Sequence, residues 1–301
     1  MNIAEEYKKS LKMAEAEEIL DLILYRPIAF VIVKIIYRLP ITPNQITYGA
    51  LVCGLLSAFQ FAQGTESGFL WGAIWFAIAN VLDCGDGMLA RLQKSGSPLG
   101  RLVDGVVDWI SSVAIFFGLG MGLSAYFGVQ GYWLLAIAAG VTSGYHAMVF
   151  DKRQQAYIST VRGEPNFIER ESEKIDVEMQ KSGNMVRRFF LSIYKSYLTV
   201  QEGREHKEEE IVNYPPELYR AKNKTIMRWW TWLGPTTNRT LLILGGIILH
   251  PEWFCWVVLV PVNIYLIAMF AWQKSVTRTL DLAVATSTPN TLHVTVEHPV
   301  Y

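Results

Sequence analysis

The chain has 301 residues, of which 51% are hydrophobic and only 18% are charged. Together with a mean hydropathy of +0.22, this composition excludes an ordinary soluble protein and favours an integral membrane protein. Lysine plus arginine equals aspartate plus glutamate at 27 each, so the overall charge gives no reason to expect a nucleic-acid partner.

Residues 1–41 predict amphipathic helices that lie on a membrane surface. Apolar residues within 3–24 are mixed with clustered glutamate and lysine, and residues 28–37 form a second segment of this kind. Pro40 and the Thr42-Pro43-Asn44 turn then mark the start of the first crossing, because proline is tolerated in the opening turn of a helix but not in its interior.

Six apolar stretches approach the ~20 residues that a helix needs to cross a bilayer. They cover residues 42–62, 68–91, 100–127, 131–151, 229–250 and 252–273. The short loops on one side carry no lysine or arginine, whereas the opposite side is rich in both, so the positive-inside bias predicts that the basic side and both chain ends are cytoplasmic. The expected fold is therefore an all-α, multi-pass integral membrane protein with six transmembrane helices, preceded by the amphipathic surface helices.

Two further regions are expected on the cytoplasmic side. Residues 152–228 form a charged insertion between the first four crossings (42–151) and the last two (229–275), and residues 276–301 form a tail whose Thr-rich part from Thr279 to Tyr301 we expect to be partly extended. Within the insertion, apolar residues from Val186 to Leu198 recur at helical spacing, which fits a helix on the membrane surface or one packed within the insertion. His293, Glu297 and His298 in the tail fit a strand-like segment better than a metal site.

Four aspartates lie on or near two neighbouring predicted crossings, at positions Asp83, Asp86, Asp104 and Asp108. An uncompensated aspartate at the centre of a membrane helix disfavours insertion by about 2.5 to 3.5 kcal/mol, so we expect a bound cation or a wet cavity. Helical spacing places the first pair on one face of its helix and the second pair on one face of the next. All-oxygen ligation suits Mg²⁺ or Mn²⁺, and we expect two ions, held by these four side chains.

The spacing around these aspartates carries a family resemblance. The pattern Asp83-x-x-Asp86-Gly87-x-x-Ala90-Arg91, then eight residues, then Gly100-x-x-x-Asp104-x-x-x-Asp108, is similar at every fixed position to the signature of the CDP-alcohol phosphotransferase family, also called the CDP-alcohol phosphatidyltransferases. The Thr42-Pro43-Asn44 segment also resembles the one that opens the first membrane helix in many members.

The resemblance implies roles for the matching residues. Asp83, Asp86 and Asp104 would hold metal that bridges the pyrophosphate of a CDP-alcohol, and Asp108 would be the general base or a further metal ligand. The remaining positions would contact substrate, with Arg91 near the nucleotide phosphates; they are Asn44, Gly87, Ala90, Arg91 and Gly100. A homodimer embedded among membrane lipids is also implied.

Three cationic residues outside the motif are further candidates for substrate binding. Arg239 lies within the fifth predicted crossing, where a charge indicates either a site for a phosphate-bearing substrate or a side chain that snorkels to the headgroups. Lys152 and Arg153 end the fourth crossing and either line the mouth of the same site or anchor the helix.

The predicted activity is Mg²⁺-dependent transfer of a phosphatidyl group from CDP-diacylglycerol to a polar alcohol, such as inositol or inositol phosphate, with release of CMP. Ser97-Pro98-Leu99-Gly100 instead resembles the enzymes that transfer from CDP-choline or CDP-ethanolamine to diacylglycerol. Trp109 follows the last aspartate, where the glycerol-phosphate and inositol types usually have lysine or arginine. A cation channel or transporter, or an inactive relative that acts as a scaffold, would also carry acidic residues in membrane helices.

Overall fold

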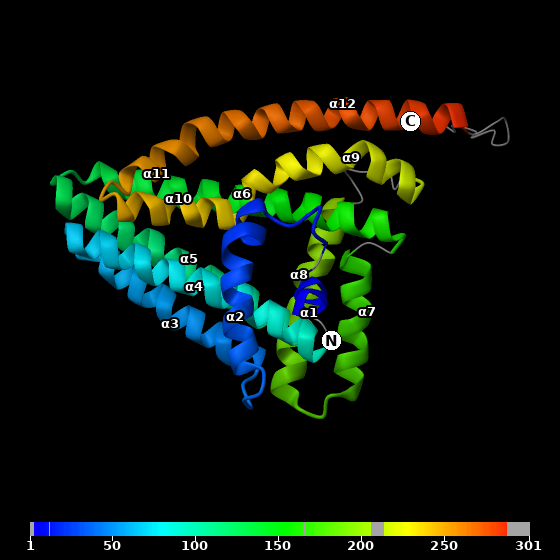
Figure 1. Cartoon of the computed structure of the whole chain (residues 1–301), viewed down its shortest axis with the longest axis horizontal. Coiled ribbons are helices and arrows are strands. Elements are labelled where there is room, and N and C mark those ends of the chain that lie inside the picture. Colours follow the sequence, from blue (N-terminus) through cyan, green and yellow to red (C-terminus); the bar gives the residue numbers. More distant parts are fainter. Residues whose placement is uncertain (1–2, 12, 165–166, 206–213, 288–301) are drawn as a thin grey trace, which may run out of the picture.

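The computed structural model describes residues 3–11, 13–164, 167–205 and 214–287, and all regular structure in these residues is helical (Figure 1). The first half contains α1 (Ile3–Ser10), η1 (Asp21–Tyr25), α2 (Arg26–Ile36), α3 (Pro43–Ala62), α4 (Glu66–Gln93), α5 (Pro98–Phe127) and α6 (Gly131–Arg162). The second half contains α7 (Phe167–Lys181), α8 (Met185–Glu205), α9 (Pro216–Trp230), η2 (Thr231–Leu233), α10 (Pro235–Ile247), α11 (Glu252–Val257), η3 (Val258–Val262) and α12 (Asn263–Ser287). The predicted all-α fold is confirmed.

Five helices in the described part of the chain are long and apolar enough to cross a membrane. They are α3, α4, α5, α6 and the continuous stretch Glu252–Val284, with lengths of 20, 28, 30, 32 and 33 residues. The chain is therefore a multi-pass membrane protein, and four of its crossings follow one another directly along the sequence.

The predicted crossing 229–250 is not a single helix, so the count of six crossings is not confirmed. α9 ends at Trp230 and continues into η2, which ends at Leu233 before the extended backbone of Gly234, and α10 then begins at Pro235 with only 13 residues. At about 1.5 Å per residue this helix is about 20 Å long, shorter than the ~30 Å hydrocarbon core. The break follows from Pro235, because a proline pushes the preceding residue out of helical geometry.

The last helix is longer than predicted. α12 continues to Ser287, whereas we expected the crossing to end at 273 and the tail to be partly extended from 279 onward. The first part of the predicted tail is therefore helical, because nothing between 274 and 287 interrupts the helix. His293, Glu297 and His298 lie outside the described residues.

α3 packs against both α4 and α5 and so joins the two helices that carry the aspartates (Figure 1). Its start is set as predicted, because Thr42 at the N-cap and Gln45 at N3 form a reciprocal capping box around the first turn, which opens with Pro43. Gly118 and Gly122 of α5 lie directly on the backbone of α3, where an added Cβ would overlap the carbonyl groups of Ala58 and Phe61. These glycines allow the close approach of the two backbones.

The N-terminal region differs from the predicted helix over 3–24. α1 ends at Ser10, residues 14–17 form a turn and a bend, and the helix resumes at Ile19 and continues into η1 at Asp21. The part between the helices does not lie on a surface, since Glu17 and Glu18 are 1% and 4% exposed. The second predicted helix is present as α2, which buries Ala29 and Val33 and exposes Ile35 on its opposite face.

The insertion contains a helical hairpin that is attached to the start of α5. α7 and α8 pack together through Ile175, Leu191 and Leu198, with Leu99 of the α5 N-terminus beside them. Arg101 of α5 donates two hydrogen bonds, of 2.7 and 2.5 Å, to the buried carboxylate of Glu171 on α7. The predicted helix near 186–198 is therefore present as α8, which packs Leu191 and Leu198 within the insertion and leaves Phe189, Phe190 and Ile193 of the predicted apolar face exposed.

Candidate metal and substrate site

Three of the four predicted aspartates converge at one point in the bundle. Asp83 and Asp86 from α4 and Asp104 from α5 each direct a carboxylate oxygen to a position within 4.8 Å of the other two. Asp86 is the most buried of the three and accepts a 2.6 Å hydrogen bond from the Thr47 hydroxyl of α3. α3, which packs against both α4 and α5, therefore also orients the Asp86 carboxylate.

Asp108 lies one helical turn beyond Asp104 and is paired with Arg239 of α10. The Arg239 guanidinium is 3.0 Å from Asp108 and 2.7 Å from Asp83, and it also donates a 3.0 Å hydrogen bond to the Asn80 amide oxygen. Its side chain is only 16% exposed. The guanidinium is therefore turned into the bundle, between the two acidic helices, and does not snorkel away from them.

A small cavity lies beside this ion-pair network. Its walls come from α3, α4, α5 and α10 and include Asn80, Asp83, Asp108, Ser111 and Arg239. Its volume is about 20 Å³, which is room for about one water molecule. A larger groove of about 540 Å³ lies between Gly96–Pro98 and the α7–α8 hairpin, and its lining contains none of the four aspartates.

The small residues of the motif lie near the ends of the acidic helices. A Cβ added to Gly100 would be 3.7 Å from the Asn44 amide oxygen, so the starts of α5 and α3 are adjacent. A Cβ added to Gly87 would be 3.4 Å from the Arg91 guanidinium. Arg91 itself donates a hydrogen bond to the backbone carbonyl of Ser10, which ties α1 to the end of α4.

Arg153 is not brought to the carboxylates. Its guanidinium lies 5.8 Å from the ring centre of Trp230 and 6.0 Å from that of Phe270, in the packing between α6, α9 and α12. Lys152 precedes it on α6 and is partly buried. Ala90 is partly buried near the end of α4, one turn beyond Asp86.

Several residues around the site were not anticipated from the sequence. Asn80 precedes Asp83 by one turn, and Thr47 follows the opening motif of α3, so helical spacing and polarity within apolar segments were the available signals. Glu18 gave no such signal, because it belongs to a charged segment that resembles an exposed helix. The pKa of Glu18 is raised to about 8, because burial and the neighbouring Asp21 outweigh the hydrogen bonds from Thr236 and Thr237, which favour the ionised carboxylate.

The donor set fits a hard divalent cation. Three carboxylate oxygens within 4.8 Å of one another lie close enough for a single ion to bind all three. Mg²⁺ and Mn²⁺ prefer oxygen ligands. Without a cation, the carboxylates of Asp83, Asp86 and Asp104 would repel one another. The site therefore has the composition of a divalent-metal centre in a membrane protein.

Comparison with known families agrees with this geometry. Residues 40–168 match the family model described as CDP-alcohol phosphatidyltransferase, a segment that spans α3 to α6 and all four aspartates. Over this segment the chain is similar to the CDP-alcohol phosphatidyltransferase family, as the motif indicated.

Three curated relatives are similar over parts of their length. The archaetidylinositol phosphate synthase of Pyrococcus horikoshii is 35% identical over 89 residues, 30% of this chain and 46% of the relative. The cholinephosphotransferase 1 of Gallus gallus is 36% identical over 110 residues, 33% of this chain and 32% of the relative. The phosphatidylinositol phosphate synthase of Mycolicibacterium smegmatis is 30% identical over 152 residues, 49% of this chain and 62% of the relative. In each case less than two thirds of the relative is covered.

Proposed function

We propose that this protein transfers a phosphatidyl group from CDP-diacylglycerol to the hydroxyl of a phosphate-bearing polar alcohol, such as inositol phosphate, and releases CMP. The observation that carries this proposal is the cluster of Asp83, Asp86 and Asp104 with Arg239 directly beside it. The carboxylates suit the metal-bound pyrophosphate of the donor, and the arginine suits a second, anionic substrate. Two of the relatives are named as inositol phosphate lipid synthases.

The chemistry is a substitution at phosphorus. The acceptor hydroxyl oxygen forms a bond to the lipid-bearing phosphorus, the bond from that phosphorus to the bridging pyrophosphate oxygen breaks, and CMP leaves with the electron pair. A divalent cation bound by Asp83, Asp86 and Asp104 would supply charge neutralisation of the pyrophosphate. Asp108 would accept the hydroxyl proton, and its ion pair with Arg239 would hold its carboxylate in place until substrate binds.

Arg239 would bind the acceptor phosphate. A guanidinium that already contacts two carboxylates can exchange one of them for a phosphate without losing its other partners, Asp83 and Asn80. The neighbouring cavity, with Ser111 and Asn80 in its walls, would widen to admit the acceptor hydroxyls. Gly87, Ala90 and Arg91 would accommodate the nucleotide at the end of α4.

The test uses the purified full-length chain in lipid nanodiscs with Mg²⁺. CMP release and transfer of radiolabel into lipid are measured for CDP-diacylglycerol with inositol phosphate, with free inositol, and without acceptor. We expect turnover with the phosphorylated acceptor, its loss with EDTA, and its recovery with Mg²⁺ or Mn²⁺. Cation flux through proteoliposomes without any CMP release would instead support a channel.

A second candidate is transfer from CDP-choline or CDP-ethanolamine to diacylglycerol. It is favoured by the similarity to the Gallus gallus cholinephosphotransferase 1 and by Ser97-Pro98-Leu99-Gly100. The same assay with CDP-choline and diacylglycerol decides between the two candidates, because each predicts CMP release with a different pair of substrates. In the second candidate the acceptor is a lipid without a phosphate, so Arg239 would have no acceptor phosphate to bind.

We further propose that the site and both chain ends lie on the cytoplasmic side and that the protein is a homodimer. The loop that ends α5 at Gly128 lacks basic residues, whereas the α4–α5 connection carries Lys94 and the first turns of α5 carry Arg101. An impermeant maleimide should label Ser95→Cys only from the cytoplasm and Val129→Cys only from outside, since both positions are exposed and the native cysteines are buried. Chemical crosslinking in the native membrane tests the dimer.

A further inference from the structure

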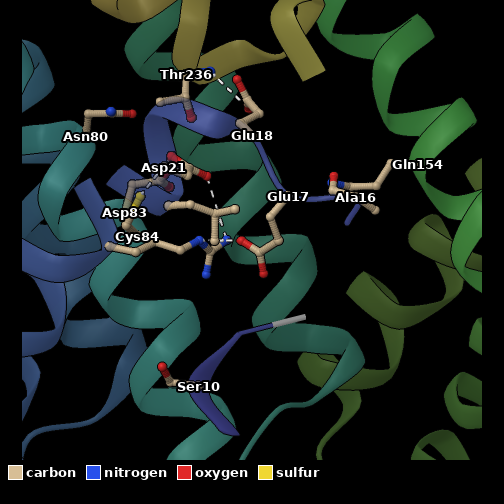
Figure 2. Close-up of polar contacts among 12 residues, drawn as sticks. Ser10, Ala16, Glu17, Glu18, Asp21, Asn80, Asp83, Cys84, Gln154 and Thr236 are labelled. Carbon is tan, nitrogen blue, oxygen red and sulfur yellow. Dashed lines mark hydrogen bonds and ion pairs between the residues drawn. The ribbon is translucent and has the colours of Figure 1, made fainter. Parts of the chain in front are cut away.

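The segment between α1 and α2, here called the N-terminal strap (residues 13–25), passes between helices that are far away in the sequence. Figure 2 shows its charged side chains among α4, α6 and α10. Gln154 of α6 donates a 2.6 Å hydrogen bond to the Ala16 carbonyl, and Arg228 of α9 donates one of 3.1 Å to the Glu17 carbonyl. The strap is therefore part of the packed interior at the end of the bundle.

Glu18 is the strap residue that contacts α10. Its two carboxylate oxygens accept hydrogen bonds from the backbone N–H groups of Thr236 (3.2 Å) and Thr237 (3.0 Å), and Figure 2 shows Glu18 beside Thr236. These are N–H groups of the first turn of α10, which have no partner within the helix itself. α10 lacks a side-chain cap of its own, because the residue at its N-cap position is Gly234. The cap is thus supplied by a residue 218 positions earlier in the chain.

The fit around this contact depends on the absence of a side chain at Gly234. A Cβ at that position would overlap the Glu18 carboxylate. The backbone of Gly234 has φ of −68° and ψ of 162°, which any residue can adopt. Glycine is therefore required here for space and not for backbone conformation.

α10 in turn carries Arg239, and the strap contacts the helix on both sides of this residue. Glu18 binds at Thr236 and Thr237, and the Tyr25 hydroxyl is 2.9 Å from that of Thr240. Arg239 lies between these two contacts and reaches Asp83 at 2.7 Å and Asp108 at 3.0 Å. A shift of α10 by about 1 Å would lengthen and misalign both ion pairs, and displacements of this size can reduce turnover by about 100-fold.

We propose that Glu18 is a positioning residue, which caps α10 from the N-terminal strap and thereby holds Arg239 at Asp83 and Asp108. The effect on turnover rests on the proposed function, because it assumes that Arg239 binds the acceptor phosphate. The effect on α10 does not rest on it. Backbone hydrogen exchange reports the effect on α10, and kinetics report the effect on turnover, so measuring both separates the two effects.

The first variant is Glu18→Ala, studied as the full chain in nanodiscs. Loss of a helix cap should increase hydrogen exchange at the amides of Thr236 and Thr237 by about fivefold. The acceptor KM should rise about tenfold, with a much smaller change in the KM of the CDP-lipid donor. Glu171→Ala removes another buried carboxylate that lies away from α10, and it should leave exchange in α10 unchanged.

Two further variants approach the same contact from the other side. Gly234→Ala should displace the Glu18 carboxylate and reproduce the exchange and KM changes of Glu18→Ala, although Glu18 is still present. Gly234→Ser in the Glu18→Ala background provides a hydroxyl at the N-cap and should restore both readouts toward wild type.

Each result either supports the positioning role or overturns it. Unchanged exchange at the start of α10 in Glu18→Ala refutes the cap, whether or not the wild-type protein is active. Faster exchange with an unchanged acceptor KM refutes the link to Arg239. Absence of all wild-type turnover contradicts the proposed function, while the exchange data still test the cap. Failure of Gly234→Ser to restore exchange also refutes the capping argument.

Discussion

Replacement of Arg239 by methionine is the most informative test of the ion-pair network, because it removes the cation and keeps most of the side-chain length. With an effective dielectric constant of about 20, a unit charge pair at the 2.7 Å distance between Arg239 and Asp83 attracts by about 6 kcal/mol. Release of the buried guanidinium from its desolvation offsets part of this, and the Asp108 carboxylate is 41% exposed and therefore screened. We expect a net loss of about 2 to 4 kcal/mol in metal-free protein.

The assay is thermal unfolding of Arg239→Met and wild type in detergent, with EDTA and with saturating Mg²⁺. In EDTA the variant should melt about 4 to 16 °C lower, since about 1 kcal/mol corresponds to ~2 to 4 °C for a chain of this size. Mg²⁺ should stabilise the variant more than the wild type, because the ion replaces the missing positive charge and no longer competes with Arg239 for Asp83. The difference in melting temperature should therefore shrink when Mg²⁺ is added.

Arg153→Met is the matched control, because its guanidinium lies over Trp230 and Phe270 and not at the carboxylates. It should lower the melting temperature only slightly, by an amount independent of Mg²⁺. An equal deficit of Arg239→Met in EDTA and in Mg²⁺, or no deficit in EDTA, would refute the view that Arg239 and the metal neutralise the same carboxylates.

Three other changes test the site and the packing. Asp104→Asn removes a carboxylate from the three-aspartate cluster and should lower CMP release by about 100-fold or more; full activity would exclude the proposed metal site. Gly118→Ala should destabilise the protein by about 1 to 3 kcal/mol through overlap with the Ala58 carbonyl, whereas Gly144→Ala, with open space around it, should not; equal melting temperatures would contradict the close approach of α3 and α5. Hydrogen bonding to Arg220, with further contacts to Tyr157 and Lys224, lowers the pKa of Glu15 to about 2 from an ordinary 4.5. Because the folded-state pKa is depressed, the stabilisation is present above pH 4.5 and is lost as the pH falls toward 2. Glu15→Gln should therefore lower the free energy of unfolding at pH 7 by less than about 1 kcal/mol after screening, seen as a lower melting temperature, and should match wild type near pH 2; a difference that persists in acid would be inconsistent with this pair.

The sequence by itself determined the class of fold and the position of the acidic cluster. Apolar length predicts α3 to α6, since a helix must satisfy its backbone hydrogen bonds within the bilayer whatever its neighbours are. Helical periodicity then places Asp83 and Asp86 on one helix face and Asp104 and Asp108 on another, and the motif spacing indicated the family that residues 40–168 match. These properties depend on local sequence, so they could be predicted without knowledge of tertiary contacts.

Only the tertiary structure decided how the remaining charges are paired. Hydropathy predicted one crossing over 229–250, but Gly234 and Pro235 divide it and leave the short α10 packed against α4. Arg239 is 156 residues from Asp83, and Glu18 is 218 residues from Thr236. Periodicity shows which face of a helix is polar but not which distant group meets that face. The partners of a buried charge are chosen by the packing of the whole chain, because only a folded interior makes an unpaired charge costly.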